Sequence, residues 1–498
     1  MNILFRLDAS SSIGAGHFER CLTIARSIKS TFDKAKVVFV CHELAPVFIK
    51  KLEYAAIEYI PFRHEFQSEK HDAEQLLSIL KNHFYDYIFI DHYQLQAKWE
   101  SSLRPHCRVL IALDDLTTRQ HTNIDYLVDQ TYGRTAEQYP SSLPENCKTL
   151  FGSKYAILRE EFKETRNKAI IKRESYKSVK QVVISLGAMN TGEYTLPLLS
   201  YLVQYRLENQ LHFNIQILLS SSAKGLTDIK KYIAPYHFIK LQLDCTHIAD
   251  AYLQADIAIG ACGTSTWERC SLGLPTIAVT LASNQLTIAK QLHGAGAHYY
   301  LGEAHSVKIS DFKDAFSEIT SNIDTYSNMV RKALEIVDGQ GVENLLKKIQ
   351  LSDVHLRLAE LSDINTVYQW QSQSVIRQYS RNTQPISYDE HCAWMTKALA
   401  NEHRHIFIIE LKVSSRIEHV GMLRLDKFKD GYEISILVCP QHHQQGIAKR
   451  ALALIPEKFK TSKIYATVLQ KNLASQQLFL NSGYSKISPE EYLLQPTS

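Results

Sequence analysis

The chain has 498 residues, enough for about three folding units that each bury their own core, and this length excludes a single small binding module. Hydrophobic residues make up 45% and charged residues 22%, with only 19 Gly and 13 Pro, which is typical of globular and not of disordered chains. The net charge of +4 is too small to supply by itself the attraction that nucleic acid or an anionic membrane needs. We expect a soluble protein that binds neither.

Cysteine usage and the apolar runs indicate the cellular compartment. Nine cysteines occur without CxxC or Cys/His ligand spacing, so we expect reduced, mostly buried thiols and no metal site. No apolar run approaches the roughly 18 residues of a spanning helix. Arg6 and Asp8 interrupt the core that a signal peptide would need. The sequence therefore predicts a cytoplasmic protein.

Short apolar runs alternate with helix-like stretches through the first 350 residues. Strands are expected at 2–7, 36–41, 85–91, 108–115 and 124–129, with a helix at 18–30. A second series of strands is expected at 181–187, 213–220, 237–243, 255–260 and 275–281, ending in a polar helix at 344–350. Such alternation is typical of parallel βαβ units. The sequence predicts an α/β chain with two Rossmann-like domains, residues 1–165 and 166–350.

The pattern changes near Leu351 to Val354. A strand and two helices precede three apolar runs in quick succession, at 407–413, 419–428 and 432–440, and another helix follows. Closely spaced strands of this kind are typical of an antiparallel meander. We expect a third, α+β domain over residues 353–498.

The first strand runs into a glycine loop that opens a helix. Gly14, Gly16 and His17 lie on this turn, at the edge of a parallel sheet where ligands bind. A dinucleotide fingerprint is disfavoured because Glu19 stands where the third glycine is required. Bare amides at a helix N-terminus and an imidazole suit an anionic substrate and proton transfer. His17 is a candidate base, with helix capping as its alternative role.

Five stretches, in register, carry a resemblance to a known family. They read RLDASSSIGAGHFERCLTIA, IDHYQL, ALDD, YAILREEF and ACGTSTWERCSLGLPTIAVTLASNQ. Residues 1–350 resemble the UDP-sugar hydrolases of pseudaminic acid biosynthesis, which cleave UDP-2,4-diacetamido-2,4,6-trideoxy-β-L-altropyranose. The resemblance implies a GT-B-like arrangement of the two Rossmann-like domains, with water in place of a sugar acceptor. The family's catalytic histidine and tyrosine fall on His17 and Tyr93.

The residue types in these stretches fit that chemistry. Attack of water at an anomeric carbon needs a base and a stabilised UDP leaving group. We expect His17 to hold the water, and Tyr93 with His92 to position the sugar by hydrogen bonding. Without the resemblance, the stretch IDHY would be interpreted as a strand-end cap. Asp114 and Asp115 are assigned no role.

A second glycine loop follows the strand at 255–260. Gly263, Thr264 and Ser265 offer backbone and hydroxyl donors at a helix N-terminus, which suits a diphosphate. Glu268, one turn into the helix, can accept both ribose hydroxyls. This arrangement is similar to the nucleotide-sugar site of GT-B enzymes, in which a glutamate of the same helix binds the ribose.

Other residues near this loop concern the sugar and the diphosphate. Trp267 either lines the sugar pocket or belongs to the core. Gln285 matches a polar stretch that lies near the diphosphate or the sugar in the family. Ala188 and Met189 depart from the family pattern, which has a second glycine followed by a small polar residue, and this departure concerns fine substrate specificity.

The third domain resembles the GNAT acetyltransferases in its order of strand, glycine loop and helix. Their pyrophosphate loop falls on HQQGIA, where His443 replaces the usual Arg or Gln. The resemblance implies that the amides of Gln444, Gly446 and Ala448 cradle the pyrophosphate of acetyl-CoA. Acetyl-CoA is the expected co-substrate.

The same resemblance assigns the rest of the acetyl-CoA site. Leu437 and Val438 are expected to pair with the pantetheine through main-chain hydrogen bonds. Asn472 ends a strand in VLQKNLASQQLFLNSGY, which resembles the second GNAT motif.

Acetyl transfer to an amine needs a base for the amine and an acid for the thiolate. Glu433 is the candidate base, and an exposed strand-end carboxylate is the alternative. Many GNATs supply the acid from a tyrosine where this chain has Phe479. Phe479 cannot donate a proton, so Tyr484 is the substitute candidate.

The stretch RQYSRNTQPISYDEHCAWM resembles the nucleotide-amino-sugar branch of GNATs. Arg377, His391 and Trp394 are therefore candidate acceptor-site residues. His391 and Trp394 lie three apart on an expected helix, so an interior packing pair is the alternative.

The motifs together predict a bifunctional enzyme of pseudaminic acid biosynthesis. It would acetylate the 4-amino group of UDP-4-amino-4,6-dideoxy-N-acetyl-β-L-altrosamine and hydrolyse the UDP-diacetamido sugar to UDP and free sugar. The expected partners are UDP-amino-sugar substrates and acetyl-CoA. Two alternatives stay open: a GT-B glycosyltransferase fused to an acyltransferase, and a non-catalytic sensor of nucleotide sugar and CoA.

Overall fold

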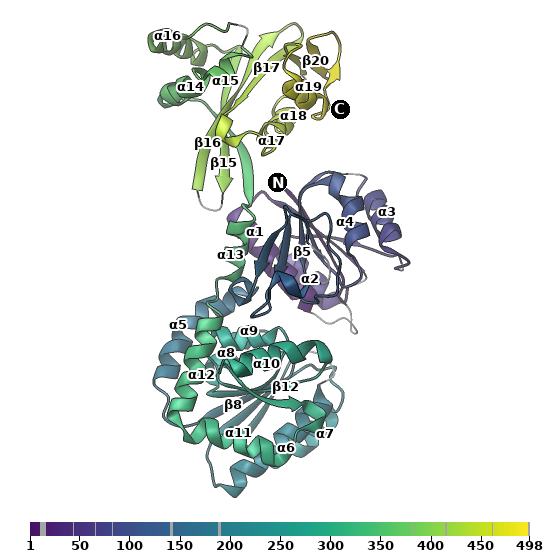
Figure 1. Cartoon of the computed structure of the whole chain (residues 1–498), viewed down its shortest axis with the longest axis vertical. Helices are drawn as coiled ribbons and strands as arrows, with labels where there is room; N and C mark the ends of the chain where they lie inside the picture. Colours follow the sequence, from purple (N-terminus) through teal and green to yellow (C-terminus); the bar gives the residue numbers. More distant parts are fainter. Residues whose placement is uncertain are drawn as a thin grey trace. The chain divides into compact units, whose positions relative to one another are not determined.

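The structure, a computed structural model, describes all residues except 10–15, 43, 65, 82, 140–142, 188–190, 381, 414–415, 461 and 497–498. It forms two compact units, Asn2–Ile349 and Gln350–Ser498, which run from purple to green and from green to yellow in Figure 1. Gly14, Ala188 and Met189 lie outside the described residues.

The first sheet has seven parallel strands in the order β3-β2-β1-β4-β5-β6-β7. Because β1 lies between β2 and β4, the order of the strands reverses there. Open α/β sheets bind ligands at such a switch point, beyond the carboxyl ends of the strands. The strands are β1 (Asn2–Leu7), β2 (Lys36–Cys41), β3 (Glu58–Pro61), β4 (Tyr85–Asp91), β5 (Cys107–Leu113), β6 (Tyr126–Asp129) and β7 (Lys148–Phe151).

Side chains of β1 alternate between two helix-covered faces, as a strand requires. Leu4 packs in a core with Leu76 and Trp99, whereas Phe5 stacks on Phe89 at 4.6 Å between ring centroids on the other face. The helices of this part are α1 (Gly16–Thr31), α2 (Pro46–Tyr54), α3 (Glu69–Ile79) and α4 (Ala97–Leu103), with the 3-10 turns η1 (Arg104–His106), η2 (Ala136–Gln138) and η3 (Ser153–Tyr155).

The second sheet has six parallel strands in the order β10-β9-β8-β11-β12-β13. Val182 and Ile184 of β8 pack against α6, α7 and α11, while Val183 between them packs against α5, α8 and α9. The strands are β8 (Gln181–Ser185), β9 (Asn214–Leu219), β10 (Ile239–Leu243), β11 (Ile257–Ala261), β12 (Thr276–Thr280) and β13 (Tyr299–Glu303).

Helices cover both faces of this second sheet, as Figure 1 shows. They are α5 (Glu160–Glu174), α6 (Gly192–Glu208), α7 (Leu226–Ile233), α8 (Ile248–Gln254), α9 (Ser265–Ser271), α10 (Leu286–Gly294), α11 (Ile309–Ser321) and α12 (Ile323–Ile336), with the 3-10 turns η4 (Ser283–Gln285) and η5 (Ala304–Ser306). The last helix of the unit, α13 (Gly341–Lys348), packs against η3 and α1 instead.

The unit Gln350–Ser498 is built on a seven-stranded sheet in the order β14-β15-β16-β17-β18-β20-β19. The strands β14 to β17 form the expected antiparallel meander, and β18 pairs with β17 in parallel. The strands are β14 (Ser352–Leu358), β15 (Arg404–Val413), β16 (Arg416–Phe428), β17 (Gly431–Val438), β18 (Lys463–Thr467), β19 (Ser485–Lys486) and β20 (Glu491–Leu494).

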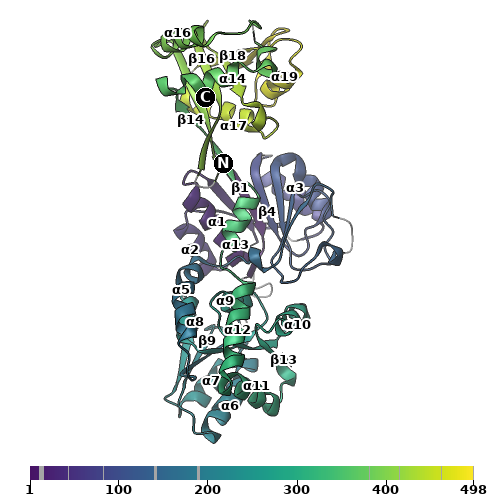
Figure 2. The ribbon, with the colours of Figure 1, turned by 60° about the vertical axis from the view of Figure 1, so that its left-hand side comes forward.

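Two groups of helices cover the two faces of this sheet (Figure 2). One apolar core includes Trp370 and Met395 of α14 and α16, and the other includes Ala451 and Phe479 of α17 and α19. The helices are α14 (Ile364–Gln371), α15 (Ser374–Arg377), α16 (Tyr388–Leu399), α17 (Ile447–Ala453), α18 (Ile455–Lys458) and α19 (Leu473–Leu480), with the 3-10 turns η6 (Leu361–Asp363) and η7 (Pro440–His442).

The predicted fold class is confirmed: two parallel α/β sheets precede an α+β unit. In the first unit the prediction missed three short strands, β3, β7 and β13. All three lie at the ends of their sheets and are only partly buried, so they lack the apolar pattern by which buried strands are identified.

Three further features concern membrane-spanning helices, cysteines and metal ligands. None of the described helices combines the length and apolarity needed to cross a bilayer. The nine cysteines are free thiols, most of them buried. Within the described residues, no three His, Cys, Asp or Glu side chains gather in a way that could hold a metal ion.

Candidate functional site

His17 and Asp91 meet at the switch point of the first sheet. His17 lies in the first turn of α1, which follows β1, and Asp91 ends the neighbouring strand β4. The Nδ1 of His17 is 2.5 Å from Oδ1 of Asp91. Because a carboxylate can only accept, Nδ1 carries the hydrogen and Nε2 presents a lone pair. Nε2 is buried and has no hydrogen-bond partner in the described part of the chain.

Asp91 is held as an anion. The guanidinium of Arg20 donates to both carboxylate oxygens, with Nη2 2.5 Å from Oδ1, and a further nitrogen lies 3.1 Å from Asp115. Burial alone would raise the pKa of Asp91, but Arg20 and His17 hold that pKa well below its usual range. Asp91 therefore stays ionised at neutral pH and orients the imidazole of His17.

Tyr93 borders the same imidazole. Its ring stands edge-on to the ring of His17, with centroids 4.5 Å apart at 89°, and the side chain is 38% exposed. Burial, followed by the nearby charge of Asp115, raises the pKa of Tyr93 to about 12. The phenol is thus a neutral donor that is accessible from solvent, as sugar positioning requires.

His92 differs from the expectation. Its Nδ1 accepts from the amide of Gln94 at 3.1 Å, and its Nε2 donates to Asp8 at 2.9 Å. Asp8 is itself held by Arg6 at 2.7 Å. Both ring nitrogens are therefore engaged within the protein, so neither is left for a sugar, and His92 anchors the end of β4 to the end of β1.

The second glycine loop lies opposite the first. A Cβ atom added at Gly16 would lie 4.0 Å from the side-chain methyl carbon of Thr264. A Cβ atom added at Gly263 would lie 3.9 Å from Nε2 of Gln285. The structure thus brings these four predicted residues to one place. The hydroxyl of Ser265 accepts from Arg269 at 3.0 Å.

Trp267 and Glu268 are neighbours with different environments. Trp267 is 2% exposed and packs in the apolar core with Tyr252. It supports α9 from inside, which is the core alternative of the sequence analysis. Glu268 is partly exposed and binds Arg159, with Nη2 3.0 Å from Oε1.

In the unit Gln350–Ser498, β18 pairs with β17 from Gly431 to Ile434. The rest of β17, up to Val438, extends beyond this pairing. The amide of Cys439 donates to the carbonyl of Val420 in β16. Alternation therefore turns the main chain of Leu437 toward β16 and that of Ile436 and Val438 toward the open edge. Ile436, which the prediction missed, and the amide of Val438 face that edge, and Leu437 does not; the carbonyl of Val438 accepts from His443.

The glycine loop after β17 has the backbone that a phosphate cradle needs. Gln444 and Gly446 have φ of 61° and 70°, and Gly446 immediately precedes α17. His443 donates from Nε2 to the carbonyl of Val438 at 2.8 Å, which ties the loop to the strand. Ala448 lies in the first turn of α17.

Glu433 and Asn472 both have protein partners. The hydroxyl of Thr467 donates to Oε1 of Glu433 at 2.6 Å, across the region where β17 and β18 pair. Asn472 caps α19, its Oδ1 accepting from the amide of Ser475 at 3.1 Å.

The predicted acceptor-site residues lie together on α15 and α16 but point to different partners. His391 is 1% exposed, and its Nε2 donates to the carbonyl of Ile364 at 3.0 Å. Its ring centroid lies 5.7 Å from that of Trp394. Burial lowers the pKa of His391. The two rings pack together as in the alternative interpretation, with His391 buried and Trp394 partly buried. Arg377 donates to the carbonyls of Asn382 and Gln384 and orders that loop.

Tyr484, the substitute acid, is buried and packs against Phe479 with ring centroids 5.0 Å apart. Burial raises the pKa of Tyr484 well above its usual range. Its hydroxyl lies inside the core of the unit, so the structure does not present it at the end of β17.

The sequence analysis assigned no role to three residues of the first unit: Arg20, Asp91 and Arg159. The position of Asp91 at the carboxyl end of β4 was a usable signal, because β1 and β4 are the strands at the switch point. Arg20 and Arg159 carry no comparable signal, because their partners are distant in the chain.

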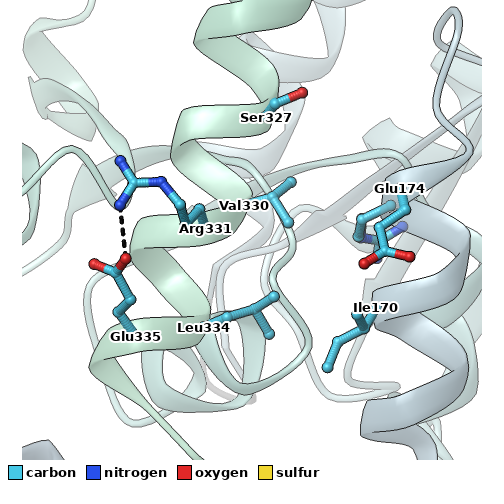
Figure 3. Close-up of a pocket in the computed structure, with 8 residues that line it drawn as sticks. Ile170, Glu174, Ser327, Val330, Arg331, Leu334 and Glu335 are labelled. Carbon is cyan, nitrogen blue, oxygen red and sulfur yellow. Dashed lines mark hydrogen bonds and ion pairs between the residues drawn. The ribbon is translucent and has the colours of Figure 1, made fainter.

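A separate groove lies between α5 and α12 (Figure 3). Ile170, Val330 and Leu334 form its apolar floor, and Arg331 pairs with Glu335 at its rim. None of the predicted site residues lines it.

Comparisons with known proteins agree with both halves of the prediction. Residues 353–485 match the model of the Acetyltransferase (GNAT) domain. The uncharacterized protein MJ1062 of Methanocaldococcus jannaschii is 24% identical over 499 residues, 98% of this chain and 97% of its own. The UDP-2,4-diacetamido-2,4,6-trideoxy-beta-L-altropyranose hydrolase of Campylobacter jejuni is 25% identical over 296 residues, 59% of this chain and 97% of its own.

Among solved structures, MurG of Acinetobacter baumannii matches with a TM-score of 0.51 at 15% identity, over 70% of this chain and 99% of its own. This likeness concerns the fold alone and supports the GT-B-like arrangement of the first unit. The first unit is thus similar to a UDP-sugar hydrolase, and residues 353–485 of the second match the Acetyltransferase (GNAT) domain.

Proposed function

We propose that residues 2–349 hydrolyse UDP-2,4-diacetamido-2,4,6-trideoxy-β-L-altropyranose to UDP and the free sugar. The observation that carries this proposal is the His17–Asp91 pair, with an unpartnered, buried Nε2 at the switch point. The Campylobacter jejuni hydrolase, which aligns over 97% of its length, supports the choice of substrate.

His17 acts as the general base. Its Nε2 takes a proton from water while the water oxygen forms a bond to the anomeric carbon. The bond from that carbon to the UDP oxygen breaks, and UDP leaves with the electron pair. Asp91 stabilises the imidazolium that forms, because it already accepts from Nδ1 and stays ionised. The neutral phenol of Tyr93 donates to the sugar.

The second glycine loop receives the leaving group. The free amides around Gly263 and Thr264, ahead of α9, suit the charge that grows on the diphosphate. Glu268 accepts the ribose hydroxyls. The approach of the two loops at Gly16 and Thr264 supports a sugar position in which the anomeric carbon lies between the base and the phosphate donors.

We further propose that residues 350–498 acetylate the 4-amino group of UDP-4-amino-4,6-dideoxy-N-acetyl-β-L-altrosamine. Acetyl-CoA supplies the acetyl group as a thioester. The open edge at Val438 and the loop at Gln444, Gly446 and Ala448 fit its pantetheine and pyrophosphate, since their peptide groups are not paired with another strand. Glu433 accepts the proton of the amine as nitrogen bonds to the acetyl carbon. The carbon–sulfur bond breaks, and CoA leaves as the thiolate with the electron pair.

These two reactions are consecutive. Acetylation of the 4-amino group creates the diacetamido sugar that the hydrolase accepts. The alignment of MJ1062 over nearly the whole chain supports a role for both parts in one protein.

The test follows the acetyl mass shift and free UDP by mass spectrometry, with the UDP-4-amino sugar as substrate. Release of UDP and diacetamido sugar that depends on acetyl-CoA is expected. Acetylation without UDP release, even from the purified diacetamido substrate, contradicts the hydrolase assignment and favours a glycosyltransferase.

Single substitutions distinguish the hydrolase activity from the acetyltransferase activity. His17→Ala is expected to stop UDP release and leave acetylation intact, whereas Glu433→Gln is expected to stop acetylation and leave hydrolysis of the diacetamido substrate intact. UDP release at the wild-type rate from folded His17→Ala protein overturns the assigned base.

A further inference from the structure

Arg159 and Glu268 form an ion pair between segments distant in the chain. Arg159 immediately precedes α5, and Glu268 lies in α9. Nη2 of Arg159 is 3.0 Å from Oε1 of Glu268, and Nη1 is 2.7 Å from Oε1 of Glu161. The guanidinium carbon also lies 5.2 Å from the ring centroid of Phe162. Three neighbours therefore fix the guanidinium.

The ion pair engages only one oxygen of Glu268. No donor contacts Oε2 among the residues that the structure describes. The side chains of Arg159 and Glu268 are 25% and 18% exposed, so both reach solvent. One carboxylate oxygen is thus held by the protein, and the other remains able to accept a hydrogen bond.

We propose that Arg159 is a positioning residue of the nucleotide site: it holds Oε1 of Glu268 so that Oε2 is preorganised to accept ribose hydroxyls. The inference rests on the proposed function, which assigns the ribose to Glu268. A glutamate has three rotatable side-chain bonds, and fixing them before the ligand arrives lowers the entropy cost of binding. Arg159 also screens Glu268 from the like charge of Glu161.

This role differs from that of a structural ion pair. Loss of a purely structural pair lowers stability and reduces the affinity for every nucleotide equally. Loss of a positioning residue reduces the preference for a ribose over a 2′-deoxyribose, because that preference depends on the acceptor oxygen of Glu268. The affinity ratio of UDP to 2′-deoxy-UDP is therefore the decisive readout.

The experiment measures this ratio by titration calorimetry on the full chain. The variants are Arg159→Gln, Arg159→Lys and Glu268→Gln, with Arg331→Gln as a matched control. Arg331 belongs to an exposed ion pair with Glu335 on α12 (Figure 3), so its substitution removes the same charge away from the glycine loops.

Wild-type protein is expected to prefer UDP by about tenfold, the effect of one hydrogen bond to a charged acceptor. Glu268→Gln and Arg159→Gln are expected to reduce this preference several-fold, Arg159→Lys to restore part of it, and Arg331→Gln to leave it unchanged. An unchanged ratio in Arg159→Gln, with both affinities lowered equally, overturns the inference while the ribose assignment stands.

Failure of the proposed function has a different signature. Equal wild-type affinity for the two nucleotides removes the ribose assignment of Glu268, and the inference with it. Absence of any UDP binding overturns the nucleotide-sugar function itself.

Discussion

At the scale of single residues, the hydrolytic site depends on pairs that are far apart in sequence. His17 and Asp91 are separated by 74 positions, and Arg20 secures Asp91 from the same helix as His17. The motif predicted His17 and Tyr93 but gave no partner for the imidazole. Which nitrogen of His17 acts as base follows only from the contact with Asp91.

Replacing Asp91 tests this pair. Asp91→Asn is expected to lower the rate of UDP release by about 100- to 10,000-fold, because the amide can donate to Nδ1 and shift the hydrogen to Nε2. Steady-state kinetics measures the rate, and circular dichroism checks the fold. Asp125→Asn, at an ion pair with Arg104 in another part of the sheet, is the control. A rate within a few-fold of wild type shows that Asp91 does not orient the base.

Elements of the fold position these residues, and close contacts show where the backbone allows no side chain. Gly260 in β11 faces the guanidinium of Arg269, which would lie 2.6 Å from an added Cβ. Arg269 in turn donates to Ala261 and Ser265, so it connects the end of β11 to the start of α9. The strand motif predicted β11, but the need for glycine at this position is visible only in the structure.

Gly260→Ala is expected to reduce the free energy of unfolding of the first unit by about 1–3 kcal/mol, because buried Arg269 has to move. Urea denaturation measures the change. Gly294→Ala is the matched control: nothing lies within 4 Å of the added carbon, and alanine in a helix stabilises by roughly 0.5–1 kcal/mol relative to glycine. An equal response of both variants contradicts the role of the close contact.

His298 links α10 to β13 and makes stability depend on pH. It donates to the carbonyl of Ala289 at 2.8 Å, and burial lowers its pKa to about 4. The unfolded chain binds the proton near pH 6.5, so the folded state loses stability as pH falls from about 7 to 4. Between pH 7 and 5 this loss is about 2 kcal/mol.

His298→Gln keeps a donor without titrating and is expected to lack this part of the pH dependence. Urea denaturation at both pH values measures the difference between wild type and variant. Parallel pH dependence of the two proteins shows that His298 titrates normally in the folded state.

At the scale of the whole molecule, the chain consists of two compact units that meet in sequence between Ile349 and Gln350. The first unit has two sheets and the second has one, and each unit has its own apolar cores. The antiparallel meander of the second unit contains no strand of the first. We therefore expect each reaction of the proposed pair to use residues of one unit only.

Separate expression of residues 1–349 and 350–498 tests this independence. Each fragment is expected to unfold cooperatively, and a mixture of the two is expected to acetylate the UDP-4-amino sugar and release UDP. Calorimetry and mass spectrometry measure these outcomes. Loss of both activities on separation, with rescue only in the intact chain, shows that one unit completes the other.

The sequence alone determined the fold class and predicted where the main sites lie, because buried strands and glycine loops leave local patterns. Strands with two buried faces appear as apolar runs, and the loops at His17, Gly263 and Gly446 follow them directly. Short edge strands such as β3 left no such pattern, since their faces are half exposed.

Only the tertiary structure decided which side chains remain available. It engaged both nitrogens of His92, placed Trp267 and His391 inside cores, and brought Arg159 to Glu268. The physical reason is that availability depends on hydrogen-bond partners and burial, which arise from residues far apart in the chain. A motif specifies the residue type at a site, but the surrounding packing determines which of its atoms can meet a substrate.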